Sequence, residues 1–306
     1  MTQKIIIDTD PGQDDAMALM LACKSAELDV LAVTTVCGNS TLENTTRNAR
    51  FILNFIGKKD IPVYSGAEKP LQRELIQAVV HGKSGLEGID PTNEAVLTGD
   101  AVERILHLVK SHPNEVTLVT LGPFTNIALA IQKDPEVMML VKEIVSMGGA
   151  INVAGNKNRV AEFNIFVDPE AANIVMRFPV KKTLVPLDAC NHVLMQPQDI
   201  DRIKNSRLRN LLGKMMTSYI AKLEKDTGDK GALMYDPLTI FYLLQPASCW
   251  TVEKNVQVET KGEITRGMTV VDKRNVPDGL EPNATIVTHI ESQDFIDCFI
   301  GRLGTA

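Results

Sequence analysis

Short apolar runs alternate with amphipathic stretches along the first two thirds of this sequence. The run from Lys4 to Asp8 is followed by apolar residues at helical spacing from Ala16 to Cys23, and a second strand-like run spans Leu28 to Val36. Continuous β-branched runs of this length are typical of parallel strands that are buried on both faces. The alternation therefore predicts an α/β fold with a mostly parallel open sheet and helices on both faces.

The rest of the chain continues this pattern. Further strands are expected at residues 61–64, 116–121, 143–147 and 182–187, and further helices at 48–56, 101–110, 125–131 and 169–176. The last third predicts helices over 197–225, 236–244 and 295–303, and strands over 256–260 and 268–272. Asp100 is an expected N-cap, whereas Thr41 lacks the partner three residues later that a capping box needs. Because no linker or repeat interrupts the pattern, we expect residues 1–306 to form a single domain.

The composition limits which partners and which cellular compartment we expect for this protein. The 306 residues are 44% hydrophobic and 23% charged with a formal net charge of -6, which is ordinary for a soluble globular protein. Without a basic patch or a long apolar run, neither nucleic acid nor a membrane is an expected partner. Five scattered cysteines form no CxxC pair and predict neither a zinc site nor a disulfide framework. With no signal peptide before the first strand, we expect a cytoplasmic protein.

The loop after the first strand carries four aspartates within eight residues: Asp8, Asp10, Asp14 and Asp15. In an open α/β sheet, ligands bind beyond the carboxyl ends of the strands. A single aspartate at a helix start often only caps the helix, but four neighbouring carboxylates repel one another and favour a bound cation. Oxygen ligands favour calcium or magnesium, and such a cation can activate water. The loop therefore predicts metal-assisted hydrolysis without naming a substrate.

The segment from Asp8 to Ala16 (DTDPGQDDA) resembles the signature of the inosine-uridine preferring nucleoside hydrolases. Later segments resemble the same family in the same order: 119–128, 147–150, 161–171, Asp236-Pro237 and 267–272. The resemblance spans nearly the whole chain. It implies the Rossmann-like fold of that family and an N-glycosyl hydrolase that splits ribonucleosides into ribose and free base.

The resemblance also implies a role for each matching residue. Calcium would be bound by the carboxylates of Asp10, Asp15 and Asp236 and by the backbone carbonyl of Leu121, with Asp10 as general base. The residues that it places around the ribose are Asp14, Asn39, Met147, Asn156, Glu162, Phe163 and Asn164. The carboxylate and amide oxygens of this set would stabilise the positive charge that develops on an oxocarbenium-like sugar in the transition state. The family further implies a homodimer or homotetramer.

The sequence departs from the family pattern next to the expected site. Tyr235 stands where purine-capable members usually have histidine, and tyrosine, with a pKa near ~10, is a poorer acid at pH 7. Gln13 also replaces a more usual histidine, which we expect to be minor. His81 matches a histidine that the family places near the base. It lies in the glycine-containing segment 78–91, which, like segment 222–234, is expected to be an active-site loop.

Two alternatives remain open at this stage. Asp8-Thr9-Asp10 could serve a metal phosphohydrolase as an aspartyl nucleophile pair, but Gly12 stands where that scheme normally needs threonine or valine. The chain could also be a nucleoside sensor or inactive relative that keeps the calcium and ribose contacts. Phosphate release from a phosphomonoester tests the first alternative, and reducing-sugar release from a nucleoside tests the second.

Overall fold

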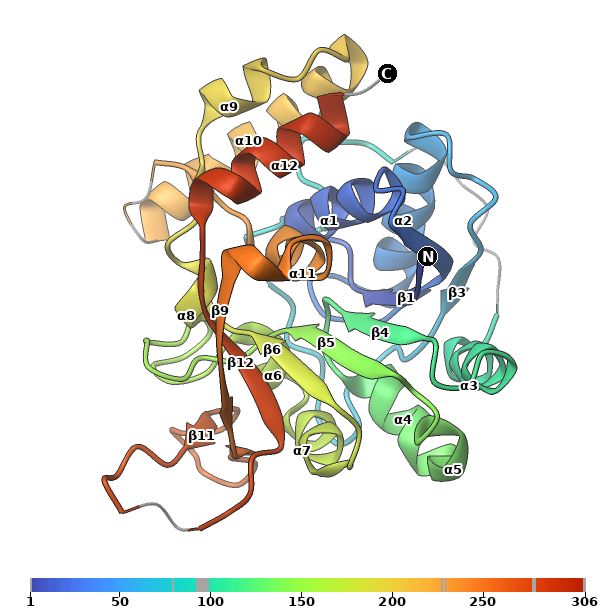
Figure 1. Cartoon of the computed structure of the whole chain (residues 1–306). Coiled ribbons are helices and arrows are strands. Elements are labelled where there is room, and N and C mark those ends of the chain that lie inside the picture. The colour runs from blue at the N-terminus through green and yellow to red at the C-terminus, as the bar shows by residue number, and fades with distance from the viewer. Residues whose placement is uncertain are drawn as a thin grey trace.

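The computed structural model describes residues 2–78, 80–91, 99–226, 228, 230–276 and 279–304. An eight-stranded sheet runs through the molecule in the order β3-β2-β1-β4-β5-β6-β12-β9 (Figure 1). Its strands are β1 (Gln3–Thr9), β2 (Leu28–Thr35), β3 (Val63–Ser65), β4 (Thr117–Thr120), β5 (Glu143–Met147), β6 (Lys182–Val185), β9 (Cys249–Lys254) and β12 (Ala284–Ile290). All neighbouring pairs are parallel except β12 and β9, where the edge strand is antiparallel.

Strand β1 shows why the sheet is buried on both sides. Ile5 and Ile7 are fully buried in one hydrophobic core, and Ile6 between them is buried in a second core. Because successive side chains of a strand point to opposite faces, an unbroken apolar run supplies both cores at once. The sheet therefore needs helices on both faces.

Two sets of helices supply that cover. On one face lie α1 (Gln13–Cys23), α2 (Leu42–Phe55), α10 (Ser206–Asp226), α11 (Tyr235–Leu244) and α12 (Ser292–Gly304). On the other lie α3 (Ala101–Ser111), α4 (Thr125–Lys133), α5 (Pro135–Met138) and α7 (Pro169–Arg177) (Figure 1). The predicted fold class is thus confirmed. No helix of the described residues has the length and apolar character that crossing a bilayer requires.

Several element boundaries differ from the sequence predictions. Helix α2 begins at Leu42, because the Thr41 hydroxyl alone caps it by accepting from Asn44 N at 3.4 Å. The segment 197–225 is helical as predicted, but it is divided into two helices. The chain forms α9 (Pro197–Asp201) and then α10, because Asn205 Oδ1 accepts from Leu208 N at 3.0 Å and starts a new helix.

The C-terminal strands also differ from expectation. The predicted pair forms β10 (Val256–Val258) and β11 (Thr269–Val271), a separate antiparallel sheet. Strands β9 and β12 were not predicted; β9 is mostly exposed and so has no apolar run. The remaining elements are α6 (Phe163–Val167), α8 (Leu187–Cys190), β7 (Leu194–Met195), β8 (Ala232–Leu233) and the 3₁₀ turn Pro246–Ser248.

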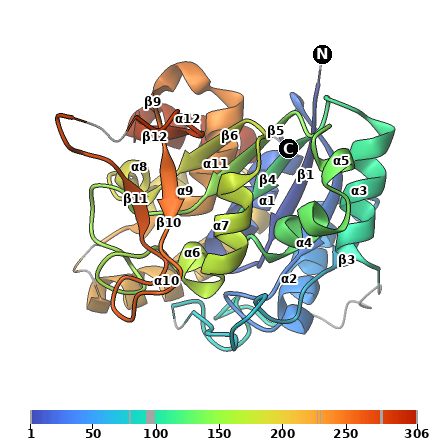
Figure 2. The same ribbon diagram turned by 90° about the horizontal axis from the view of Figure 1, so that it is seen from below.

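The carboxyl ends of the central strands form one edge of the sheet, and the loops beyond them carry the expected site residues. Asp8 of β1 pairs with Thr34 of β2 and with Thr120 of β4, and the three strands end at nearly the same level, at Thr9, Thr35 and Thr120. Figure 2 shows α6, α10 and the described residues 80–91 gathered on the side of the molecule opposite the N-terminus. This is the edge at which ligands bind in open α/β sheets.

Candidate active site

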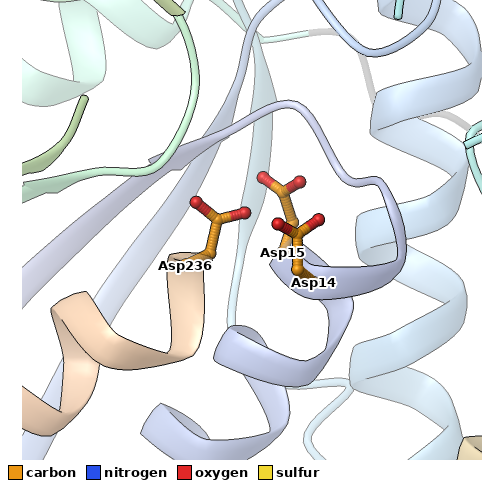
Figure 3. A group of neighbouring side chains, drawn as sticks. All are labelled: Asp14, Asp15 and Asp236. Atoms are coloured by element: carbon orange, nitrogen blue, oxygen red, sulfur yellow. The ribbon is translucent and has the colours of Figure 1, made fainter. Parts of the chain in front are cut away.

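Three buried carboxylates converge beyond the end of β1. Asp14 and Asp15 lie in the first turn of α1, and Asp236 lies in the first turn of α11. One oxygen from each lies within 4.8 Å of the other two, and the side chains point toward one another (Figure 3). Oxygens that bind one calcium ion at about 2.4 Å lie no further apart than this. We call these residues the carboxylate group.

Backbone and amide donors fix Asp15 within this group. Its Oδ2 accepts from Gly12 N at 2.9 Å and from Asn39 Nδ2 at 3.0 Å. Its Oδ1 accepts from the Thr9 hydroxyl at 2.5 Å and from Asp10 N at 3.2 Å. The turn between β1 and α1 therefore holds the carboxylate in one orientation.

Asp10, the expected general base, lies beside the carboxylate group rather than within it. Its Oδ2 accepts from Asn39 N at 2.6 Å, whereas its buried Oδ1 has no hydrogen-bond partner among the described residues. Gly122 leaves room for it, since a Cβ there would lie 2.5 Å from Asp10 Oδ1, and a Cβ on Gly38 would also overlap the carboxylate. The site therefore contains an oriented carboxylate oxygen that is free to bind another group.

The electrostatics of these carboxylates favour a cation. Burial, followed by repulsion from neighbouring carboxylates, raises the pKa of Asp10, Asp14 and Asp236 well above its ordinary value. The buried Oδ1 of Asp14, like that of Asp10, has no hydrogen-bond partner in the described part of the chain. A hard divalent cation offsets the repulsion and binds such oxygens, so this donor set fits calcium or magnesium.

Asp8 has a different environment from the other aspartates of the loop. Its Oδ1 accepts from Thr34 Oγ1 at 2.5 Å and from Asn126 Nδ2 at 2.7 Å. Burial raises its pKa to about 7. These bonds direct Oδ1 to β2 and α4, and Asp8 is not among the residues that line the cavity beside the carboxylate group, so the structure does not favour Asp8 as a nucleophile.

A cavity of about 310 Å³ opens next to the carboxylate group. Its polar lining consists of Asp14, Asn39, Asn156, Lys157, Glu162, Asn164 and Asp236. Leu121, Met147 and Phe163 line it as well. The expected substrate-binding residues are thus brought together around one cavity, whereas Asp10 and Asp15 are not among its lining residues. The roles assigned to all of these residues stay predictions.

The polar lining is connected by its own hydrogen bonds. Asn164 Nδ2 donates to the Leu121 carbonyl at 2.6 Å, and Glu162 caps α6 by accepting from Asn164 N at 2.7 Å. Asn156 Oδ1 accepts from Phe163 N at 2.9 Å. Burial raises the pKa of Glu162 to about 7. The residues between Asn156 and Asn164 therefore present a preorganised set of polar groups.

A second set of residues lines the cavity with three rings and three aliphatic side chains, and we call it the aromatic lining: His81, Tyr219 and Tyr235 with Ala78, Val80 and Leu223. The rings of His81 and Tyr219 stack with centroids 5.6 Å apart. Burial lowers the pKa of His81 to about 3, so its ring is neutral at pH 7. Such a surface suits a flat, uncharged heterocycle.

Neighbouring elements hold the loop that carries His81. Asn48 Nδ2 donates to the carbonyls of Pro11 at 2.9 Å and Ser84 at 2.8 Å, and Ser40 Oγ donates to the Lys83 carbonyl at 2.8 Å. Segment 78–91 therefore contacts both the first loop and α2. Of the two expected active-site loops, residues 79, 227 and 229 lie outside the described residues.

Sequence reasoning missed several residues of this site. Tyr219 is 1% exposed and contacts His81, yet on an amphipathic helix it is indistinguishable from a core aromatic residue. Gln13 was noted only as a departure from the family, but its Oε1 lies 2.6 Å from His81 Nδ1. Lys157 also lines the cavity, and no pattern singled it out. Leu223 lines the cavity from within the expected loop 222–234, but the first residues of that segment belong to α10.

The whole chain is similar to known proteins. Residues 5–297 match the profile described as inosine-uridine preferring nucleoside hydrolase. The pyrimidine-specific ribonucleoside hydrolase RihA of Salmonella paratyphi C is 42% identical over 315 residues, covering 99% of both sequences. The solved structure of a plant nucleoside hydrolase, PpNRh1, aligns with a TM-score of 0.93 at 31% identity over 100% of both chains. The purine-preferring ribonucleoside hydrolase from Gardnerella vaginalis aligns with a TM-score of 0.91 at 28% identity, covering 99% of this chain and 98% of its own.

Proposed function

Because the chain belongs to the inosine-uridine preferring nucleoside hydrolase family, we propose that its carboxylates serve a calcium-dependent cleavage of the N-glycosidic bond. The chain is a ribonucleoside hydrolase, an N-glycosyl hydrolase. The observation that supports the metal is the convergence of three buried carboxylate oxygens within 4.8 Å of one another.

The residues that would hold calcium are Asp10, Asp15 and Asp236, with the Leu121 carbonyl as a further ligand. Asp14 lies close enough to contribute as well. The Asp10 Oδ1, which has no hydrogen-bond partner among the residues that the structure describes, and the all-oxygen donor set support this assignment. When bound, calcium would lower the pKa of a water molecule and orient it together with ribose hydroxyls.

The protein's own groups then carry the reaction. Asp10 takes one proton from the water as the water oxygen forms a bond to the anomeric carbon of the ribose. The bond from that carbon to the base nitrogen breaks, its electron pair stays with the base, and the departing base takes up a proton from solvent. Asp14, Asn39, Asn156, Glu162 and Asn164 hold the ribose hydroxyls, with Met147 and Phe163 against the sugar. Their oxygens stabilise the positive charge that develops on the sugar.

The leaving base lies against the aromatic lining in this proposal. Tyr235 donates a hydrogen bond to the base as it gains electron density, and His81 contacts the base from the loop after β3. Pyrimidine ribonucleosides are the first substrates that we propose, because the 42% identical relative is named pyrimidine-specific. The purine-preferring structure is more distant, at 28% identity.

We also propose that the protein acts in the cytoplasm as a homodimer or homotetramer. All five cysteines are free, which suits a reducing compartment. The support for assembly is the family resemblance, and light scattering of the purified protein measures the number of subunits.

Reducing-sugar release from uridine, cytidine, inosine and adenosine tests the activity. We expect ribose and free base in equal amounts, with faster release from the pyrimidine nucleosides. A matched assay with deoxyuridine tests the ribose contacts, because a missing hydroxyl leaves buried polar groups unpaired and slows the reaction. Binding of uridine without sugar release would contradict the proposed function.

A further inference from the structure

Gln13 links the first loop to the aromatic lining. It is fully buried at the start of α1, and its side-chain amide lies between the His81 ring and the Ser218 hydroxyl. Its Oε1 lies 2.6 Å from His81 Nδ1, and its Nε2 lies 3.3 Å from the hydroxyl of Ser218 on α10. Whichever end of the amide faces Ser218 on α10, the opposite end must face the His81 ring.

The hydroxyl of Ser218 sets the direction of this chain of hydrogen bonds. The hydroxyl oxygen lies 2.9 Å from the Glu87 carbonyl and 3.0 Å from the Met215 carbonyl, and its one proton donates to one of these two carbonyls. The hydroxyl oxygen is then an acceptor toward Gln13, so the NH₂ end of the amide faces Ser218. The carbonyl end consequently faces His81, and a carbonyl can only accept. The proton of the imidazole must therefore lie on Nδ1.

A neutral imidazole has one N–H, so a proton on Nδ1 leaves a lone pair on Nε2. The neutral form is the one that burial favours for His81. Nε2 lies 3.7 Å from Asp14 Oδ1, and both residues line the cavity. His81 thereby offers a hydrogen-bond acceptor beside the carboxylate that is proposed to bind ribose.

Close packing holds the ring in this position. A Cβ on Gly12 would lie 2.7 Å from Nδ1, so the ring rests directly against the backbone of the first loop. The ring also stacks on Tyr219 with an interplanar angle of 22°. The backbone N–H of Gln13 also points to Nδ1, at 3.3 Å, and by itself would favour an unprotonated Nδ1, but the side-chain oxygen is much closer to this nitrogen, at 2.6 Å. The closer contact decides the tautomer.

We propose that Gln13 is a positioning residue that holds His81 in its Nδ1–H tautomer, so that Nε2 accepts a hydrogen bond from an N–H group of the nucleobase. This inference rests on the proposed function for the identity of the ligand. Uracil offers such a donor at its ring N–H and cytosine at its amino group. Gln13 thus sets the recognition of the base without touching it.

The tautomer is measured directly in the free protein by two-bond ¹H–¹⁵N correlation spectra of ¹⁵N-histidine-labelled protein near pH 7. His81→Asn identifies the signals of His81 by their loss. We expect wild-type His81 to show a protonated Nδ1 and an unprotonated Nε2. Gln13→Met, which has no side-chain carbonyl, should lose this pattern, and Gln13→Glu should keep it because a carboxylate still accepts from Nδ1–H.

Kinetics with uridine provide the second readout. Gln13→Met should raise KM roughly tenfold or less, the effect of one neutral hydrogen bond, and leave kcat within about threefold. Inhibition by free ribose should stay unchanged, because Gln13 acts on the base. The control is the same substitution on the other face of the sheet, Gln132→Met, which should alter neither constant.

The spectrum decides the inference whether or not uridine is cleaved. A proton on Nε2 of wild-type His81, in a protein that releases ribose from uridine, overturns the role of Gln13 and leaves the proposed function standing. Absence of sugar release from every ribonucleoside overturns the proposed function, whatever the tautomer. An unchanged His81 spectrum in Gln13→Met also overturns the inference.

Discussion

The carboxylate group and the aromatic lining of the same cavity are built in different ways. Asp14, Asp15 and Asp236 lie in the first turns of two core helices, and donors of the first loop hold Asp15. His81 instead lies on a loop that is held by side chains of α2 and contacts α10 through Tyr219. The carboxylates are thus attached to two buried helix starts, whereas the aromatic lining combines His81 on a loop with Tyr219 on α10 and with Tyr235, which precedes Asp236 on α11.

The largest effect should come from removing the proposed general base. Asp10→Asn should lower kcat for uridine by about 10²–10⁴-fold, because that is the usual contribution of a positioned base. The effect should be similar for every nucleoside, since Asp10 acts on water and not on the base. Glu263→Gln, an exposed substitution of the same kind, is the control. A decrease that depends strongly on the base would contradict the division between the two regions.

Two glycine substitutions compare the regions directly. Gly122→Ala places a Cβ 2.5 Å from Asp10 Oδ1 and should lower kcat on all nucleosides by up to about 10²-fold, as small misplacements of catalytic groups do. Gly12→Ala crowds the His81 ring and should change the ratio of kcat/KM between uridine and inosine. Gly213→Ala, where a Cβ meets no atom of the described residues within 4 Å, should leave activity unchanged. Equal loss on all substrates in both active-site variants would show that the regions are not separate.

Tyr235 tests how far the aromatic lining enters the chemistry. Tyr235→Phe should lower kcat by roughly tenfold or less, the value of one hydrogen bond to the leaving base. The decrease should differ between uridine and inosine, because the two bases place their acceptors differently. Steady-state kinetics on both nucleosides measure it. Unchanged rates on both would remove the hydroxyl from the mechanism.

The smallest effect should come from loosening the loop that carries His81. Asn48→Ala removes the hydrogen bonds to the carbonyls of Pro11 and Ser84. We expect a loss of about 1–3 kcal/mol in the free energy of unfolding and a rise of a few-fold in KM. Chemical denaturation and uridine kinetics measure the two quantities, with the exposed Asn210→Ala as control. A change in kcat larger than that in KM would argue against this role.

Burial and local hydrogen bonds explain which elements of the fold were predictable from sequence. The run from Lys4 to Asp8 predicted β1 because a fully buried strand must be apolar throughout. Strand β9 escaped prediction because it is an exposed edge strand, and the helix break before α10 escaped because one Asn205 hydrogen bond decides it. Long amphipathic stretches do not reveal such local choices.

In the site, the acidic loop was predictable because the positions of Asp14 and Asp15 follow from one strand-loop-helix unit. The contact of Tyr219 with His81 was not, because it joins a helix and a loop that are far apart in sequence. The same is true of Gln13 and Ser218, whose residue numbers differ by 205. A single sequence records the residue types of such a network but not its geometry.

Removal and return of calcium test the role of the carboxylates most directly. Protein stripped with a chelator should release no ribose from uridine, and titration with calcium should restore activity in proportion to the metal bound, reaching its maximum at one ion per chain. Calorimetry should show the same single site in wild type and its loss in Asp236→Asn. Full activity in the stripped protein, with no calcium bound, would contradict a metal-dependent reaction at Asp10, Asp15 and Asp236.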